Sequence, residues 1–319
     1  MRVFLAGASG AIGRPLVPKL IAAGHELTGM TRSEARAEEI RATGAAAAVV
    51  DVFDADALRA AVAAASPEVV IHELTALPER MDFRKKDLYT LTNRLRTEGT
   101  HNLLDGARAA GARRFVSQSI AFAYRNDGSR VKTEDEPLLD DAPAPFDGGI
   151  TALNEMEAMV LGADGLAGVV LRYGFFYGPG THYDRDGSLV ADVRRRRLPI
   201  VGKGTGVFSF IHVEDAADAT IAAVERGAPG VYNVTDDEPA PMNAWVPALA
   251  DAAGAKPPRR VPLWLAKLVG GKQAGTFASE LRGASNEKAK RELGWRPAHP
   301  SWRSGFAESL AHPVRPEGP

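Results

Sequence analysis

Three glycines near the beginning of the chain have the spacing of a phosphate-binding turn. Gly7, Gly10 and Gly13 lie between a short apolar run at 2–6 and a segment of helical periodicity at 12–23. In such a unit the glycines allow a tight turn, close approach to a pyrophosphate and packing of the helix on the strand, and the helix N-terminus attracts the phosphates. The pattern therefore favours a dinucleotide site over an ordinary strand-to-helix turn. The residues expected to form this site are Gly7, Ser9, Gly10, Ala11, Ile12 and Gly13.

The end of the second expected strand, at 26–30, indicates which dinucleotide fits. In dinucleotide folds an acidic residue at this place holds the ribose 2′-hydroxyl, whereas an arginine accommodates a 2′-phosphate. This chain has Thr31 where the acid would be, followed by Arg32 and Ser33. Because a guanidinium matches a phosphate in charge and geometry, we expect NADP(H), with NAD(H) as the alternative. The competing interpretation is that Arg32 is only a solvated residue before the next helix.

The carboxyl ends of the later strands supply the other expected contacts. These strands are expected at 45–50, 69–72, 114–117 and 169–173. Ligands of open α/β sheets bind in the crevice outside such ends, and adenine would lie beside the first of them. The contacts expected at these ends are Asp51, Val52, Leu74, Thr75, Ala76, Ser117 and Tyr173.

Helical segments alternate with the strands and must hold these loops in place. Helices are expected at 33–43, 57–65, 89–110 and 152–161. The alternation predicts a doubly wound parallel α/β sheet, the Rossmann arrangement. The long helix at 89–110 is expected to turn four leucines inward, Leu91, Leu95, Leu103 and Leu104.

The bulk composition limits the classes of partner. The chain has 319 residues, a formal net charge of −1 and no cysteine. A nearly neutral chain has no overall field for nucleic acid or an anionic membrane, no apolar run reaches membrane-span length, and the glycine loop interrupts any secretory signal at Gly7. The absence of cysteine excludes disulfides and thiolate metal sites and suits a reducing cytoplasm. We expect a cytoplasmic protein with a small-molecule substrate, no metal, no nucleic acid and no membrane.

Further motifs extend the pattern along most of the chain. They are Asn93, Gly99-Thr100-x-Asn102-Leu103-Leu104, Arg114-Phe115-Val116, Arg172-Tyr173, Tyr177-Gly178-Pro179-Gly180, Phe210-Ile211-His212-Val213-Glu214-Asp215, Tyr232-Asn233-Val234, Ser285-Asn286-x-Lys288-Ala289 and Leu293-Gly294-Trp295-x-Pro297. With the glycine loop and Asp51-Val52, they make the chain resemble the extended short-chain dehydrogenases/reductases of the NAD-dependent epimerase/dehydratase family. The resemblance runs from Met1 to about Pro297.

The resemblance implies a division of the chain and a mode of assembly. The family has a parallel sheet that carries the cofactor and a smaller C-terminal lobe that closes over the substrate. Here it implies a dinucleotide-binding domain at 1–177 and 207–235, and a substrate lobe at 178–206 and 236–319. It also implies a homodimer through the helices at 89–110 and 152–161.

One part of the family pattern is missing from this chain. The family uses a Tyr-x-x-x-Lys pair, in which the tyrosine exchanges a proton with a substrate oxygen and the lysine lowers its pKa. When the pattern is anchored on Glu157, the tyrosine position is Gly149 and the lysine position is Leu153, and no Tyr-x-x-x-Lys occurs anywhere. The family's serine position falls on Ile120, one residue after Ser119. The chain therefore resembles the atypical members of the family.

Three residues are candidates for a relocated proton donor or oxyanion contact. Ser119 could contact a developing oxyanion, and Tyr124 follows the fifth strand, although packing beneath the site is the blander interpretation. Glu73 ends the fourth strand in an apolar setting, where burial would raise its pKa and allow it to act as an acid. His182 could also serve near neutral pH, but a solvated loop histidine is the simpler hypothesis. These three candidates, and His182 with them, rest on position alone.

The sequence thus predicts an NADP(H)-binding oxidoreductase for a small carbonyl or hydroxyl compound, such as a nucleotide sugar or a secondary metabolite. Since a fold does not fix a function, two alternatives stay open. One is a regulatory or sensing protein that binds NADP(H) without turnover. The other is a non-redox reaction in which the cofactor is a structural part.

Overall fold

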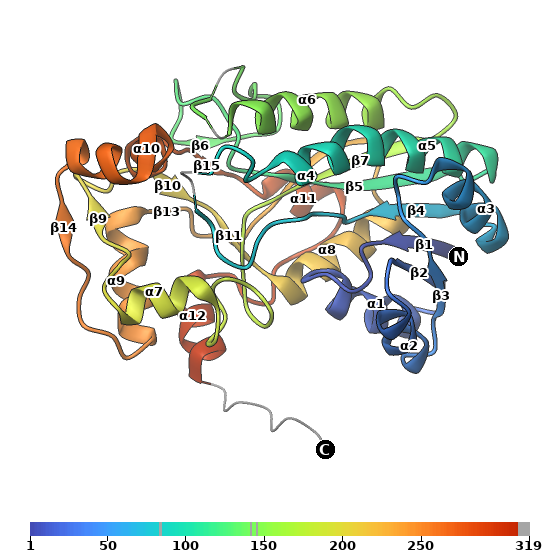
Figure 1. The fold of residues 1–319 in the computed structure, drawn as a ribbon, viewed down its shortest axis with the longest axis horizontal. Coiled ribbons are helices and arrows are strands. Elements are labelled where there is room, and N and C mark those ends of the chain that lie inside the picture. The colour runs from blue at the N-terminus through green and yellow to red at the C-terminus, as the bar shows by residue number, and fades with distance from the viewer. Residues whose placement is uncertain (83–84, 141, 145, 312–319) are drawn as a thin grey trace.

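A seven-stranded parallel sheet forms the centre of the molecule (Figure 1). The structure is a computed structural model that describes residues 1–82, 85–140, 142–144 and 146–311. The strand order is β12-β7-β5-β4-β1-β2-β3, and all neighbours are parallel. The strands span β1 Arg2–Ala6, β2 Glu26–Thr31, β3 Ala46–Val49, β4 Val69–His72, β5 Arg114–Ile120, β7 Ala167–Tyr173 and β12 Gly230–Val234. The predicted doubly wound α/β fold is confirmed.

Helices cover both faces of this sheet. Figure 1 shows α1, α2 and α8 on one side of the strands and α3, α5 and α6 on the other. These helices span α1 Gly13–Ala22, α2 Glu34–Ala42, α3 Ala55–Ala65, α5 Thr100–Ala109, α6 Asp147–Leu161 and α8 Val213–Glu225. The Asp54 side chain caps α3 by accepting a hydrogen bond from the Ala57 N–H at 3.1 Å, as Asp or Asn typically does at a helix start.

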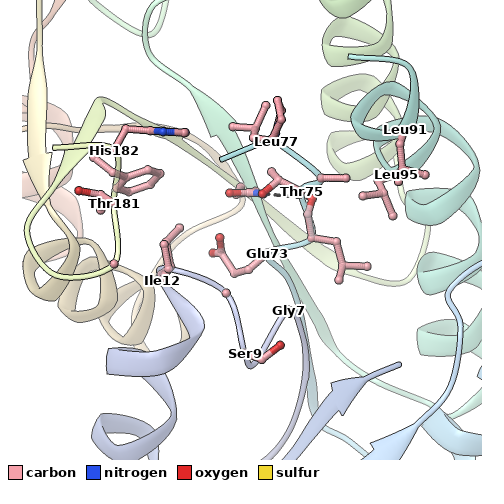
Figure 2. Close-up of a pocket in the computed structure, with 18 of the residues that line it drawn as sticks. Gly7, Ser9, Ile12, Glu73, Thr75, Leu77, Leu91, Leu95, Thr181 and His182 are labelled. Carbon is pink, nitrogen blue, oxygen red and sulfur yellow. Dashed lines mark hydrogen bonds between the residues drawn. The ribbon is translucent and has the colours of Figure 1, made fainter. Parts of the chain in front are cut away.

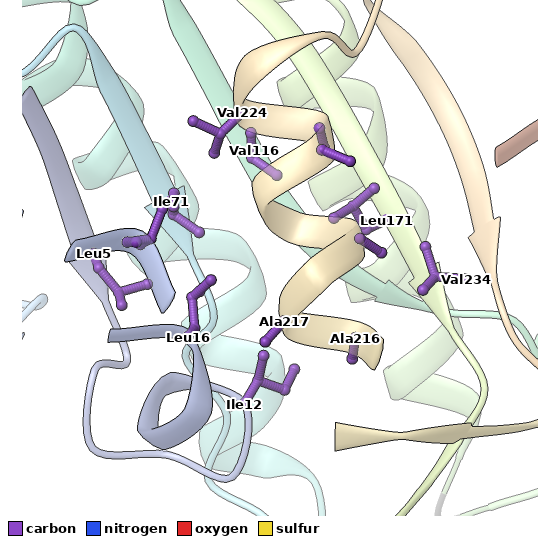
Figure 3. Close-up of a cluster of buried hydrophobic side chains, with 14 of the residues drawn as sticks. Leu5, Ile12, Leu16, Ile71, Val116, Leu171, Ala216, Ala217, Val224 and Val234 are labelled. Atoms are coloured by element: carbon purple, nitrogen blue, oxygen red, sulfur yellow. The ribbon is translucent and has the colours of Figure 1, made fainter. Parts of the chain in front are cut away.

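Alternating side chains of β1 divide between the two hydrophobic layers. Val3 and Leu5 join the cluster under α1 and α8, whereas Phe4 and Ala6 join the cluster under α3 and α5. A strand buried on both faces is apolar throughout, which explains the uninterrupted apolar run before the glycine loop. Figure 3 shows the first layer, where Ile71 and Leu171 of the sheet lie beside residues of α1 and α8.

A second group of elements packs beside one end of the sheet. Its aromatic core contains Tyr183, Phe208, Phe210, Trp245 and Phe306. The helices of this part are α7 Ser188–Arg194, α9 Met242–Ala252, α10 Leu263–Ser279 and α12 Trp302–Ala311, whereas α11 Glu287–Glu292 packs against β12 of the sheet. The short strands are β6 Val131–Lys132, β8 Phe175–Tyr177, β9 Ile200–Val201, β10 Val207–Phe208, β11 Phe210–His212, β13 Ala240–Pro241, β14 Arg260–Val261 and β15 Gly283–Ala284.

The segment 89–110, which was expected to be one continuous helix, is divided into three helical elements. It consists of α4 Thr90–Arg94, a π-helical turn η1 Leu95–Gly99 and then α5. Leu95, Leu103 and Leu104 are buried as expected, but Leu91 is 42% exposed, so its inward orientation was wrong. A π turn changes the angular position of the residues that follow it, and a uniform helical period cannot place both ends correctly. Among the described helices, none is long and apolar enough to cross a membrane.

Candidate functional site

A cavity of about 810 Å³ lies at the carboxyl ends of β1, β2, β4 and β5. Figure 2 shows the glycine loop with Gly7 and Ser9 on one side, and Thr181 and His182 on another. Glu73 lies between the loop and Thr75. This is the crevice where open α/β sheets bind their ligands.

The glycine loop is shaped as the sequence predicted. Gly7 has a φ of +106°, and the Gly10 N–H donates to the Gly7 carbonyl at 3.0 Å. A Cβ at Gly7 would lie 2.8 Å from the Glu73 carbonyl, and a Cβ at Gly13 would lie 2.6 Å from the Ala8 carbonyl. Side chains at these two positions would therefore displace backbone. The cradle fits a pyrophosphate, and the loop residues that line the cavity are Gly7, Ser9, Gly10, Ala11 and Ile12.

The next part of the cavity is cationic. Thr31, Arg32 and Ser33 line it, and Thr31 Oγ1 accepts a hydrogen bond from the Ser33 N–H at 3.3 Å. Arg36 lines it too, with its guanidinium held by Glu39 at 2.7 Å. Sequence reasoning missed Arg36, although its place in the first turn of the helix that follows Arg32 was a usable signal. The segment that follows β3 also lines the cavity, with Asp51, Val52 and Phe53.

The strand ends beyond β3 contribute only part of what was expected. Leu74, Thr75 and Ala76 line the cavity, whereas Ser117 and Tyr173 do not. Ser117 Oγ lies 3.6 Å from the sulfur of Met156. Successive residues of a strand face opposite sides of the sheet, so a residue near a strand end can be turned away from the crevice. Gly13 is also outside the lining, because its role is to let α1 pack on the loop.

Glu73 is a buried carboxyl group in the cavity wall. It is 6% exposed, and the Tyr173 hydroxyl donates to its Oε1 at 3.1 Å while Oε2 has no partner. Tyr173 also lies 2.7 Å from the Thr220 hydroxyl of α8. Burial raises the pKa of Glu73 to about 8, against the smaller lowering effect of the Tyr173 hydrogen bond. Glu73 is therefore protonated at neutral pH and can donate a hydrogen bond into the cavity.

Ser119 and Tyr124 are held in a buried polar network. The Ser119 hydroxyl donates to Glu157 Oε1 at 2.6 Å, and Glu157 forms a double contact with Arg172 at 2.9 and 2.6 Å. Ser119 lines the cavity, but its proton is already engaged. The Tyr124 hydroxyl donates to Asn233 at 2.7 Å and accepts from Arg172 at 2.9 Å, and Tyr124 is not among the lining residues.

The network fits a structural role for Tyr124 better than the predicted catalytic one. Burial raises the pKa of Tyr124 to about 12. A group that holds its proton so firmly and has no access to the cavity cannot exchange it with a substrate there. Of the three candidates, Glu73 alone combines a cavity position with an unpartnered polar atom.

The family's tyrosine and lysine positions have other roles in this chain. Leu153 is fully buried in an apolar cluster with Ile150 and Met156. Gly149 is buried beside the ring of Phe146, and its carbonyl accepts a hydrogen bond from Arg96. Both positions thus belong to the packing of α6.

Sequence reasoning missed the apolar part of the cavity. Phe122 and Phe175 stack at 4.1 Å between ring centroids, and His182 lines the wall with its Nδ1 3.0 Å from the Ser188 hydroxyl. Burial lowers the pKa of His182, so it is neutral near pH 7. The apolar lining includes Leu77, Leu91, Leu95, Ile120, Phe122, Phe175 and Phe176. Within the described residues, no group of three or more His, Asp or Glu could hold a metal ion.

Known proteins are similar to this chain in sequence and in fold. The sequence model of the "NAD dependent epimerase/dehydratase family" matches residues 3–235. A "3-diazoavenalumate denitrifying reductase" from Streptomyces sp is 48% identical over 96% of this chain and 99% of that protein. A "4-hydroxy-2-methyl-3-oxo-4-farnesyl-3,4-dihydroquinoline-1-oxide ketoreductase" from Stigmatella aurantiaca is 29% identical over 80% of this chain and 74% of that protein.

A solved structure gives the same answer for the fold. The UDP-glucose 4-epimerase of Thermus thermophilus, in complex with NAD, has a TM-score of 0.74, with 25% identity and 98% of each chain covered. The predicted family and its nucleotide-binding fold are confirmed, whereas the preference for NADP(H) stays a prediction. The chain belongs to the NAD dependent epimerase/dehydratase family.

Proposed function

We propose that this protein is an NADP(H)-dependent reductase of a small, largely apolar metabolite. The observation that carries the proposal is one continuous cavity that joins the glycine cradle, the cationic group around Arg32 and the aromatic wall at Phe122 and Phe175. When bound, NADPH would supply a hydride. Gly7, Ser9 and Gly10 would hold its pyrophosphate, and Arg32 with Arg36 would hold its 2′-phosphate.

Replacing Arg32 by alanine tests the choice of cofactor. Because a hydrogen bond to a charged group is worth roughly 1.5–3 kcal/mol, Arg32→Ala should weaken NADPH binding about 10- to 100-fold and NADH binding less than about threefold. Fluorescence titration of both dinucleotides measures this. Arg41→Ala is the control, since Arg41 lies on α2, the helix that follows Arg32, pairs with Glu34 and does not line the cavity. Equal losses for NADPH and NADH in Arg32→Ala would contradict a 2′-phosphate contact.

The missing Tyr-x-x-x-Lys pair supports a reaction that needs no strong proton donor. Reduction of a carbonyl group leaves an oxyanion that must be protonated. Replacement of an aryl diazonium group by hydride instead forms one C–H bond, breaks one C–N bond and releases N₂, and the charges balance without an added proton. The relative that is 48% identical is named for a denitrifying reduction of a diazo compound. We therefore propose the same class of reaction for this chain.

A carbonyl substrate is the second candidate, favoured by Glu73. Glu73 is the cavity residue whose raised pKa and unpartnered Oε2 suit proton donation, and another relative is named as a ketoreductase. Glu73→Gln separates the two reactions, because glutamine cannot donate a titratable proton. It should lower carbonyl reduction at least about 100-fold and change diazo reduction less than about threefold.

Turnover is measured with NADPH and two probe sets, a 3-diazo-4-hydroxycinnamate and a panel of aryl ketones. We expect one N₂ released for each NADPH consumed, with deuterium from labelled NADPH found on the ring carbon. NADPH binding without consumption by either set would instead identify a non-catalytic sensing or regulatory protein.

The assembly and the division of the chain stay predictions of this proposal. The separate aromatic core, in which Tyr183 lies against Trp245, supports a substrate lobe distinct from the dinucleotide-binding part. A homodimer through α4, α5 and α6 should appear as twice the chain mass in light scattering. We propose that the protein acts in the cytoplasm, in keeping with its lack of cysteine.

A further inference from the structure

Arg96 is a buried cation in the wall of the cavity. It is 9% exposed and lines the same cavity as Glu73. Its Nη1 donates a long hydrogen bond of 3.4 Å to the Gly149 carbonyl. In the part of the chain that the structure describes, Arg96 forms no ion pair. A guanidinium has five N–H donors, so most of its donors are left for a ligand.

Other buried cations of this protein have a carboxylate of their own. Arg172 pairs with Glu157 at 2.6 Å, and Lys132 pairs with Glu136 at 2.7 Å. A buried charge without a partner is costly, and burial lowers the pKa of Arg96 to about 10, which still leaves it charged at neutral pH. Arg96 therefore lacks the carboxylate partner that Arg172 and Lys132 have.

The neighbours of Arg96 cannot provide this anion. His72 is buried, and its pKa is lowered to about 4 by burial and by the charge of Arg96, so it is neutral. Glu157 is the nearby acid, but Arg172 and the Ser119 hydroxyl already occupy its oxygens. Glu157 acts on Arg96 only through its charge, so a direct anionic partner for Arg96 has to be a molecule in the cavity.

The surroundings indicate what kind of molecule this is. Arg96 lies in the π-helical turn η1 next to Leu95, and both line the cavity. π-Helical turns occur frequently at functional sites. The apolar wall formed by Leu77, Phe122 and Phe175 belongs to the same cavity. A flat apolar body with one anionic group would satisfy both features.

We propose that Arg96 binds the carboxylate of an apolar aromatic substrate and so selects aromatic acids over their neutral derivatives. This inference rests on the proposed function in one respect, because it takes the aromatic part of the cavity as the substrate site. Bidentate contact between guanidinium and carboxylate gives both affinity and orientation.

The test compares an acid with its ester on the intact protein loaded with NADP⁺. The probes are 4-coumarate and methyl 4-coumarate, and binding is measured by calorimetry. The unmodified protein should bind the acid at least about tenfold more tightly than the ester. This first arm needs no variant, and equal affinities for acid and ester would overturn the inference.

Variants assign the preference to Arg96. Arg96→Met should abolish the preference for the acid, Arg96→Lys should keep part of it, and neither should change NADPH affinity more than about twofold. Arg108→Met is the matched control, since Arg108 lies on α5, pairs with Asp105 and is outside the cavity lining. An Arg96→Met protein that keeps the preference, or loses NADPH affinity instead, would overturn the inference. If the unmodified protein did not bind NADPH, the proposed function would be rejected, and this outcome is distinct from a failure of the Arg96 inference.

Discussion

Gly13→Ala should reduce NADPH affinity at least about 100-fold. A Cβ at this position would lie 2.6 Å from the carbonyl carbon and oxygen of Ala8, and no side-chain rotation relieves a clash with backbone. The N-terminus of α1 must then move away from the loop, and its N–H groups no longer converge on the pyrophosphate. Fluorescence titration with NADPH measures the loss, and circular dichroism shows whether the variant is folded.

A second glycine provides the control for this prediction. A Cβ at Gly148 would lie 3.5 Å from Asn93 Nδ2, an ordinary contact, and Gly148 lies in the first turn of α6. Gly148→Ala should therefore leave NADPH affinity unchanged and stabilise the helix by roughly 0.5–1 kcal/mol. If a folded Gly13→Ala protein bound NADPH as tightly as this control, the loop would not be the pyrophosphate site.

Glu73→Gln should stabilise the protein at pH 8 but not at pH 4.5. The pKa of Glu73 is about 8 in the folded protein against 4.5 for an exposed glutamate. Between these values the folded state keeps a proton that the unfolded state has released, so stability falls as the pH rises. By pH 8 this costs up to roughly 4 kcal/mol. Glutamine keeps an acceptor for Tyr173 and does not titrate, so it removes the cost.

Urea unfolding of the variant and the parent protein at pH 4.5, 6 and 8 measures this effect. Only the difference between the two proteins is interpreted, because Asp236 also has a raised pKa of about 8 and contributes equally to both. Glu39→Gln, an exposed change on α2, should show no such trend. A free-energy difference that stays constant with pH would mean that Glu73 is ionised in the folded protein.

The glycine loop was predictable because its geometry is local. The spacing of Gly7, Gly10 and Gly13 dictates the turn, and the structure confirms the parallel sheet built around it. The sequence predicted where the strands end, but not toward which side of the sheet each residue at the strand end points. Ser117 and Tyr173 turn away from the cavity because a shift of one residue in a strand reverses the side on which each side chain lies.

The substrate half of the cavity could not be predicted in the same way. Its wall combines Leu77, Phe122 and Phe175, which come from three distant parts of the sequence and meet only in the folded chain. Arg96 reads in the sequence as one more exposed arginine among Arg94, Glu98 and other charged residues. The π turn that contains Arg96 packs against α6, and no local residue pattern indicates it.

The packing of Leu153 limits how this protein can change. Leu153 has no exposed surface and lies among Ile150 and Met156. Installing Lys at that position would place an ammonium group in hydrocarbon, at a cost of several kcal/mol, and Tyr at Gly149 would meet the ring of Phe146. Acquiring the proton-transfer couple of the family therefore requires simultaneous remodelling of a whole helix interface. A single substitution at either position would therefore destabilise the helix packing without restoring the pair. New substrate specificities should arise more readily by exchange of the aromatic wall residues.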